Sequence, residues 1–288
     1  MSKAIIGFNT AAIKYEERFM ALALKVETPD HQFETYYLQA PIVLDLLMAL
    51  QNRMGIVAHR VAEQGDSYKE QLVAANEALV KNVPQFEMAE VNQPDPNKRI
   101  MTLVLKAKEG NFALTAIQQD EQVANLHIDD MHAEFLMTAV LQSLKATGDE
   151  EAFQQVAALL DFIVLYNVDL SDLNKMDYQQ ILHEGWKQRL FSHHLGVLYC
   201  FETEEGKKVL SGIIVKTNAA HHSEEEKNIV QKIALLNTGL KTLREKYTLC
   251  QIFSTVIPAQ PDKILTMEEC LRPLHAFCVD IQAKLNAQ

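Results

Sequence analysis

The chain has 288 residues, which is enough for two domains of average size or one large domain. Hydrophobic residues make up 48% and charged residues 23% of the chain, so the composition is that of a globular protein and argues against wholesale disorder. The 38 Asp and Glu outnumber the 27 Lys and Arg, and the net charge is −11 at pH 7. A field of that sign repels phosphate backbones, so we expect no nucleic-acid partner.

The localisation prediction follows from the apolar segments and the cysteines. A membrane-spanning helix needs roughly 20 consecutive apolar residues, and the most apolar stretch, 40–50, already contains Asp45. The N-terminus also lacks the apolar run of a signal peptide. The four cysteines, at positions 200, 250, 270 and 278, form no C-x-x-C motif. We interpret them as reduced, mostly buried thiols of a cytoplasmic protein without a membrane partner.

Three strand patterns open the chain, at residues 4–13, 19–26 and 33–38. Pro41 then suits the first turn of a helix, where a missing N–H has no cost. From Ile42 onward, apolar residues recur about every 3.7 positions, and this helical spacing continues to about Asn82. Pro84 ends the pattern.

The segment 41–82 allows two interpretations. One is a continuous helix, about 63 Å long at about 1.5 Å per residue. The other is a helical hairpin, in which Gly65 ends one helix and Ser67 with Glu70 forms the capping box of the next. Because the apolar phase does not slip across Gly65, the sequence favours the continuous helix.

A similar pattern follows the loop 92–99, with strands at 100–107, 112–117 and 123–128 and a helix from Asp129 to about Ala146. It suggests an internal repeat, since 22–25 (LALK) matches 103–106 (LVLK) and 37–50 lies over 126–139 without a gap. Each copy would be a β-hairpin followed by a helix. Duplication and a chance agreement of two ββα-type patterns both remain open.

The second half of the chain predicts a separate α+β unit. A helix capped by Asp149 should end near Tyr166, and the turn-rich stretch from about 168 to 190 is the expected domain boundary. A hairpin of 195–201 with 209–215, a helix from Ser223, a strand at 248–257 and a helix from Thr266 follow. The expected fold class is therefore α+β, with an N-terminal domain at 1–170 and a C-terminal domain at 191–288.

Motifs for common chemistries are absent from the sequence. No G-x-G-x-x-G, G-x-x-x-x-G-K or G-x-S-x-G occurs, which argues against nucleotide binding by those loops and against an α/β-hydrolase nucleophile. His183 and Glu184 begin an H-E-x-x-H motif, but position 187 is Lys, so the second zinc ligand is missing. We expect no cofactor and assign no catalytic residue.

Two histidine clusters deserve comparison with metal sites. The first lies at a strand-to-helix junction and comprises His127, Asp129, Asp130 and His132. Its imidazoles and carboxylates suit a divalent metal, but aspartate at a helix start is first of all a cap, and residues 129, 130 and 132 cannot all point the same way. The structural interpretation is favoured, and no metal is expected.

The second cluster precedes the C-terminal hairpin and comprises His183, Glu184, Trp186, His193, His194 and Tyr199. Adjacent histidines on a strand face opposite sides, so at most one of His193 and His194 could join a site. Trp186 is better explained as an anchor that packs the linker onto a domain. His221 and His222 are expected in a solvated loop before the Ser223 helix.

Several segments resemble the YjeJ-like family of uncharacterised enterobacterial proteins over nearly the whole chain. They are residues 6–10 (IGFNT), 21–25 (ALALK), 126–130 (LHIDD), 133–136 (AEFL), 250–253 (CQIF) and 257–259 (IPA). The resemblance implies a soluble bacterial protein, and it supplies no activity and no catalytic residues to carry over.

Two functions from different classes remain. The first is a non-enzymatic cytoplasmic interaction or assembly protein that forms a homo-oligomer, or binds a protein partner, through the 41–82 helix. Its distal half would expose the apolar side chains Tyr68, Leu72 and Leu79. The alternative is an enzyme or a small-ligand or metal-binding protein that uses His127, Asp129, Asp130 and His132 or the region from His183 to His193.

Overall fold

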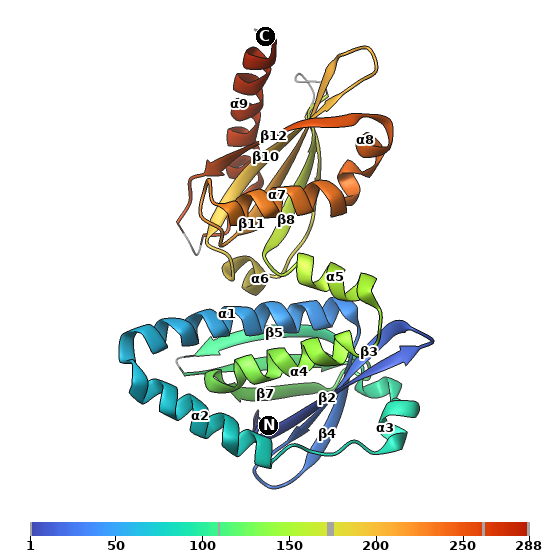
Figure 1. Ribbon diagram of the computed structural model, residues 1–288, viewed down its shortest axis with the longest axis vertical. Helices are drawn as coiled ribbons and strands as arrows, with labels where there is room; N and C mark the ends of the chain where they lie inside the picture. The colour runs from blue at the N-terminus through green and yellow to red at the C-terminus, as the bar shows by residue number, and fades with distance from the viewer. Residues whose placement is uncertain (1, 109, 172–175, 261–262, 287–288) are drawn as a thin grey trace. The chain divides into compact units, whose positions relative to one another are not determined.

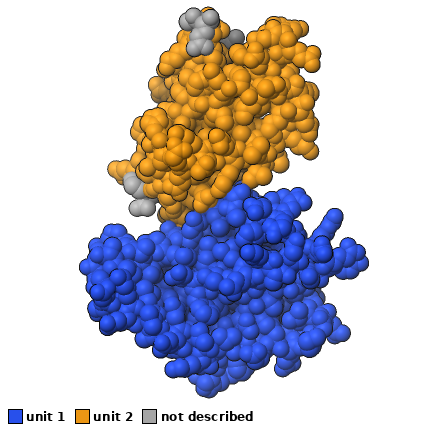
Figure 2. All heavy atoms as spheres, viewed as in Figure 1, with its two compact units in different colours: residues 1–160 blue, residues 161–288 orange. Residues whose placement is uncertain are grey.

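The computed structural model describes residues 2–108, 110–171, 176–260 and 263–286. The fold is α+β, as the sequence predicts, and the chain divides into two compact units, residues 1–160 and 161–288 (Figure 2). This division lies earlier than the stretch of about 168–190 in which the sequence placed the boundary.

Unit 1 contains two sheets. One has the strand order β1-β7-β6-β5 and the other the order β2-β3-β4. The strands are β1 (Ser2–Ala4), β2 (Gly7–Tyr15), β3 (Arg18–Glu27), β4 (Phe33–Leu38), β5 (Ile100–Lys108), β6 (Asn111–Gln118) and β7 (Val123–Asp129). The single strand expected at 4–13 is thus two strands in different sheets, since β1 pairs in parallel with β7 and β2 pairs antiparallel with β3.

The helical elements of unit 1 connect and cover these sheets. They are α1 (Ala40–Gln64), α2 (Asp66–Lys81), α3 (Met88–Asn92), the 3-10 helices η1 (Pro96–Lys98) and η2 (Asp130–His132), α4 (Ala133–Lys145) and α5 (Glu150–Ala158). Helices α1 and α4 pack on each other. Buried side chains of α1, among them Leu46, Leu47 and Leu50, form part of the core of this unit.

The two halves of unit 1 have the same topology. In each half a three-stranded antiparallel meander, β2-β3-β4 or β5-β6-β7, leads into a long helix, α1 or α4. The gapless match of 37–50 with 126–139 therefore joins equivalent strand-to-helix steps. The match of 22–25 with 103–106 is wrong in register, because it superimposes the second strand of one meander on the first strand of the other. Each unit of the repeat is accordingly βββα rather than ββα.

The favoured continuous helix over 41–82 is wrong. Gly65 has φ 67° and ψ −141°, and it separates α1 from α2. The two helices point in different directions in Figure 1. Such a backbone conformation is open mainly to glycine. The interpretation with a break at Gly65 is the one that agrees with the structure, although Gly65 itself, and not Ser67, occupies the N-cap position of α2.

The proposed interaction residues are covered within unit 1. Tyr68 is 7% exposed and Leu79 is 1% exposed, while Leu72 is half-buried. The break at Gly65 lets α2 pack against η2, α1 and β2, which cover the side chains that a straight helix would leave in water. The large apolar residues of α2 that remain exposed are Val73 and Val80. The premise for self-association through Tyr68, Leu72 and Leu79 therefore fails.

A buried ion cluster joins α1 to the β7–α4 junction. The Asp130 carboxylate accepts hydrogen bonds from Arg53 Nε at 2.7 Å, Arg53 Nη2 at 2.6 Å and Arg60 Nη1 at 2.9 Å. Asp130 is 1% and Arg53 is 3% exposed. Arg60 also hydrogen-bonds to Tyr68, so the cluster extends from α1 and η2 to α2.

Helix α1 is the one helix in the described part of the chain that is long and apolar enough to cross a membrane by length and composition alone. Half of its most apolar stretch is buried inside unit 1. The buried half contains the core side chains named above, so α1 has the burial of a core helix.

The helix that the sequence extends from Asp149 to Tyr166 is shorter in the structure. Asp149 caps α5 by accepting the Ala152 N–H at 2.9 Å, as expected, but α5 ends at Ala158. Residues Phe162–Asp169 form the strand β8, which pairs with β11 of unit 2. Its run of β-branched and aromatic residues suits a buried strand, and this pairing places the boundary before β8.

Unit 2 is a five-stranded antiparallel sheet with the order β12-β10-β11-β8-β9. After β8 come β9 (Asp177–Gln180), α6 (Gly185–Arg189), β10 (His193–Glu202), β11 (Lys208–Thr217), α7 (Glu224–Leu236), η3 (Thr238–Leu240), α8 (Lys241–Lys246), β12 (Thr248–Ile257) and α9 (Met267–Asn286). The hairpin, the Ser223 cap of α7 and the bounds of β12 agree with the sequence prediction. Strand β9 and helix α6 occupy part of the stretch expected as a linker.

Helices cover both faces of the central strands of this sheet. The Tyr199 hydroxyl donates to the Val230 carbonyl of α7 at 2.9 Å, whereas Leu274 of α9 contacts the sheet at Gly196 and Gly212. A Cβ at Gly212 would lie 2.8 Å from Leu274 Cδ2, so any larger residue there would displace this side chain. Strands β10 and β11 are therefore buried on both sides, while β12 and β9 are edge strands.

The break at Gly65 predicts opposite effects for two glycine substitutions. Gly65→Ala should destabilise the protein by about 1–3 kcal/mol, because alanine cannot adopt this backbone conformation without strain. Gly55→Ala is the matched control: Gly55 lies inside α1 with open space at its Cβ position, so alanine should stabilise by about 0.5–1 kcal/mol. Urea denaturation followed by circular dichroism measures both, and a stabilising Gly65→Ala would contradict the break.

The ion cluster predicts a large effect for Asp130→Asn. The change removes the buried carboxylate charge that accepts two hydrogen bonds from Arg53, and unit 1 should lose about 3–5 kcal/mol of unfolding free energy. Asp129→Asn, which keeps the oxygen that accepts the Met131 N–H, should change stability by no more than about 0.5 kcal/mol. Circular dichroism follows the denaturation. Fluorescence of Trp186, the only tryptophan, reports on unit 2 and should shift little.

Candidate functional site

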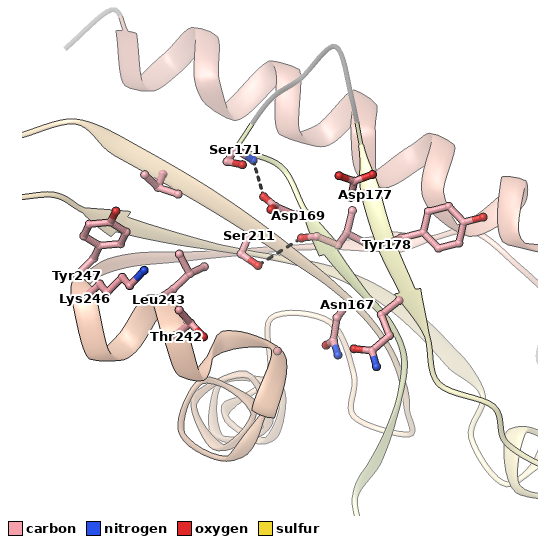
Figure 3. Close-up of a pocket in the computed structure, with 14 residues that line it drawn as sticks. Asn167, Asp169, Ser171, Asp177, Tyr178, Ser211, Thr242, Leu243, Lys246 and Tyr247 are labelled. Atoms are coloured by element: carbon pink, nitrogen blue, oxygen red, sulfur yellow. Dashed lines mark hydrogen bonds between the residues drawn. The ribbon is translucent and has the colours of Figure 1, made fainter.

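A cleft of about 560 Å³ lies in unit 2 between the β8–β9 edge of the sheet and α8 (Figure 3). Asp169 on β8 is in register with Ser211 on β11 and with Asp177 on β9, which sets two carboxylates and a hydroxyl in one row across the sheet. Lys246 and Tyr247 lie on the opposite wall. The cleft therefore presents mixed charge to solvent.

The hydrogen bonds in the cleft limit its chemistry. Ser211 Oγ donates to the Val168 carbonyl at 3.3 Å, and Asp169 Oδ1 accepts the Ser171 N–H at 2.9 Å. Ser211 is 7% exposed and its hydroxyl is engaged with the main chain, so it is not placed as a nucleophile. Tyr178 directs its ring to the other face of the sheet, where it packs edge-on against Tyr166. The arrangement suits contact with a polar or cationic group.

The first histidine cluster does not converge. Asp129 caps η2 by accepting the Met131 N–H at 2.9 Å, which confirms the interpretation of this residue as a cap. Asp130 is held by Arg53 and Arg60, and burial lowers the pKa of His132. Among the described residues, no group of three or more His, Cys, Asp or Glu side chains is arranged to hold a metal ion.

The second cluster is dispersed over unit 2. His183 Nε2 lies 2.7 Å from the Val164 carbonyl, Trp186 is buried on α6, and Tyr199 is hydrogen-bonded to α7. His193 is exposed and His194 is buried, so the two adjacent histidines face opposite ways as the sequence predicts. Trp186 is 6% exposed, which agrees with its role as an anchor.

The pair His221 and His222 is more ordered than the solvated loop that the sequence suggests. Glu226 Oε2 lies 2.9 Å from His221 Nδ1 and accepts the His222 N–H at 2.5 Å, and the two rings stack with centroids 3.6 Å apart. Burial raises the pKa of Glu226, but the hydrogen bonds that its carboxylate accepts lower it, and the net result is a lowered pKa. The pair therefore closes the N-terminus of α7 around a buried carboxylate.

Sequence reasoning missed two features at the β12 edge of unit 2. One is a pair of thiols, since Cys250 on β12 and Cys200 on β10 have their sulfur atoms 3.5 Å apart. The other is the edge strand itself: β12 has ten residues, no proline and no charged side chain. The composition of β12 was readable from the sequence, but its position at an edge depends on the pairing order of distant strands.

His194 predicts a pH-dependent stability. Burial, followed by the neighbouring charges of Lys216 and His193, lowers the pKa of His194 to about 4. The unfolded chain, with a histidine pKa near 6.5, then binds this proton first, so stability is lost as pH falls from about 6.5 to about 4, by about 3 kcal/mol. His194→Leu should remove this part of the pH dependence in urea denaturation, whereas His193→Gln should retain it. Equal slopes for His194→Leu and wild type would contradict the assignment.

Comparison with known proteins gives a family but no activity. The chain matches the YjeJ-like family over residues 1–284. It is 29% identical over 289 residues to the protein named "Uncharacterized protein YjeJ" of Escherichia coli strain K12, with 100% of this chain and 99% of that relative covered. No solved structure matches it. The chain belongs to the YjeJ-like family.

Proposed function

We propose that this chain is a non-enzymatic cytoplasmic interaction protein that assembles with a second copy of itself through the outer edge of β12. The observation that carries the proposal is the composition of that edge. Unpaired N–H and C=O groups at a sheet edge are a template for a further strand, and proteins usually block them with charge, proline or a covering segment.

The edge strands of the described sheets differ in this protection. Apart from β1, each of the other edge strands contains a charged residue: Lys14 in β2, Glu34 in β4, Lys106 in β5 and Asp177 in β9. Strand β12 (TLCQIFSTVI) contains none, although most of its residues are exposed or half-buried. Its unprotected edge is therefore distinctive within this protein.

A second copy is the partner that fits this edge best. Two β12 strands related by a two-fold axis would pair antiparallel and extend the sheet of each unit 2 without placing like charges opposite each other. Unit 2 contains 14 Lys and Arg against 16 Asp and Glu, so it carries little of the net charge of −11 and opposes such pairing little. Self-association through the 41–82 segment lacks this support, because Tyr68 and Leu79 are buried.

The alternative of a small-ligand protein rests on a different surface from the one that the sequence suggested. The histidines of both clusters are dispersed or engaged, so we place the ligand of this alternative in the cleft beside α8, which is larger than the pocket of about 290 Å³ at His222 and Glu226. Its open, mixed-charge wall and the engaged Ser211 favour binding over catalysis. No observation supports ligand binding as specifically as the uncharged edge strand β12 supports self-association.

The oligomeric state tests the proposal. Wild type at tens of micromolar should be a dimer by light scattering and sedimentation, and Val256→Lys, at a position 37% exposed on β12, should convert it into a folded monomer. Opposed lysines across the two-fold pairing would repel each other and disfavour the edge contact.

Two control variants locate the surface. Gln180→Lys places the same charge on β9, the opposite edge of the sheet, and should leave the dimer intact. Val73→Glu, on the exposed face of α2, should also leave it intact. A monomeric wild type, or a dimer that Val73→Glu dissociates and Val256→Lys does not, would overturn the proposal.

A further inference from the structure

The two thiols at the β10–β12 step are placed together by a β-bulge. Cys200 is in register with Gln251, but the next pair is Phe201 with Leu249, so Cys250 is an extra residue on β12. In a regular ladder, neighbouring residues of a strand point to opposite faces. The bulge re-aims the Cys250 side chain, whose Sγ lies 3.5 Å from Cys200 Sγ and donates to the Cys200 carbonyl at 3.1 Å.

The two sulfur atoms differ in exposure and surroundings. Cys200 is fully buried, and burial, followed by the hydrogen bond with Cys250, raises its pKa to about 12. Cys250 is exposed, and the ammonium of Lys208 lies 3.8 Å from its Sγ. Lys208 Nζ also donates to Glu202 Oε2 at 2.6 Å, and this bond holds the ammonium beside the Cys250 sulfur. The entry point for a reagent is therefore Cys250.

We propose that Cys200 and Cys250 form a modification site that a low-molecular-weight disulfide oxidises to an intramolecular disulfide bond. The Cys250 thiolate attacks one sulfur of the small disulfide, which forms a mixed disulfide and releases one small thiol. Cys200, after losing its proton, attacks Cys250 Sγ and releases the second small thiol. Two protein thiols are thus oxidised while one small disulfide is reduced to two thiols.

The other cysteines provide an internal comparison. Cys270 and Cys278 are buried on α9, and burial raises the pKa of each to about 11. They are eight positions apart on one helix, about 12 Å along its axis, which is too far for a disulfide without movement of the backbone. Oxidation should therefore be confined to the β10–β12 step. This inference does not depend on self-association, because the two thiols belong to one chain.

The experiment uses the full chain, reduced and then equilibrated in buffers of glutathione and glutathione disulfide. After quenching with N-ethylmaleimide, intact mass should fall from four alkylated cysteines to two without a retained glutathionyl group, and peptide mapping should join Cys200 to Cys250. A bond between Cys270 and Cys278, a disulfide between two chains, or four alkylated cysteines in the oxidising buffer would overturn the proposal.

Variants test the order of the two steps. Cys200→Ala should stop at the mixed disulfide and retain one glutathionyl group on Cys250, whereas Cys250→Ala should remain unmodified. Cys278→Ala should behave as wild type. Circular dichroism establishes that each variant is folded, and the alkylation count on wild type tests the proposal without any variant. A glutathionyl group on Cys200 in Cys250→Ala would contradict the assigned entry point.

Lys208 gives a kinetic test of the same site. Lys208→Gln should slow the first step several-fold at neutral pH, because the cation beside the attacking thiolate is lost. The matched control is Lys207→Gln, since the Lys207 side chain is 76% exposed and pairs with Glu205. If the first step is equally fast in the two variants, Lys208 has no role in the reaction of Cys250.

Discussion

The carboxylate of Asp130 is the constraint on which the arrangement of unit 1 depends. It lies where β7 passes into α4, and it receives the guanidinium groups of Arg53 and Arg60 from α1. Unpaired, any one of these charges would be costly to bury, so the three groups must be brought together for the core to close. Since Arg60 also hydrogen-bonds to Tyr68, the same contact fixes where α2 returns after Gly65. One acidic residue thereby ties the helices of both repeats to the segment between them.

This constraint explains why the periodicity of residues 41–82 was misleading. A regular spacing of apolar residues shows which residues are buried, but it does not show whether the helix is continuous. Two helices joined at a break can bury the same apolar residues inside their own unit. Gly65 carries the information about the break, but a glycine in phase with a helical pattern is also tolerated within a helix, as Gly55 is in α1. Arg53 and Arg60 reach Asp130 across 77 and 70 residues of chain, a contact that a local pattern cannot reveal.

The sequence predictions were correct where a feature depends only on residues close together in the chain. The caps Asp149 and Ser223, the bounds of β12 and the opposite orientations of His193 and His194 all follow from neighbouring residues, and the structure contains each of them. The strand β8 was taken as the end of a helix because its apolar residues also fit helical spacing, and only its pairing with β11 settles the matter. The Cys200–Cys250 contact was beyond reach, because it requires both the neighbouring positions of β10 and β12 and a bulge in their ladder.

The accessible functional groups of the unit 2 sheet lie on its edge strands, because α7 and α9 cover the two faces of its central strands. Peptide groups and side chains that remain available lie on β9 beside the cleft and on β12. The bulge at Cys250 divides β12 into a short distorted start and a regular run from Gln251 to Ile257. A bulge increases local twist and interrupts regular pairing, so a further strand would find its continuous hydrogen-bonding partner in that regular run. The same irregularity that brings two thiols together therefore limits the register available to a second copy.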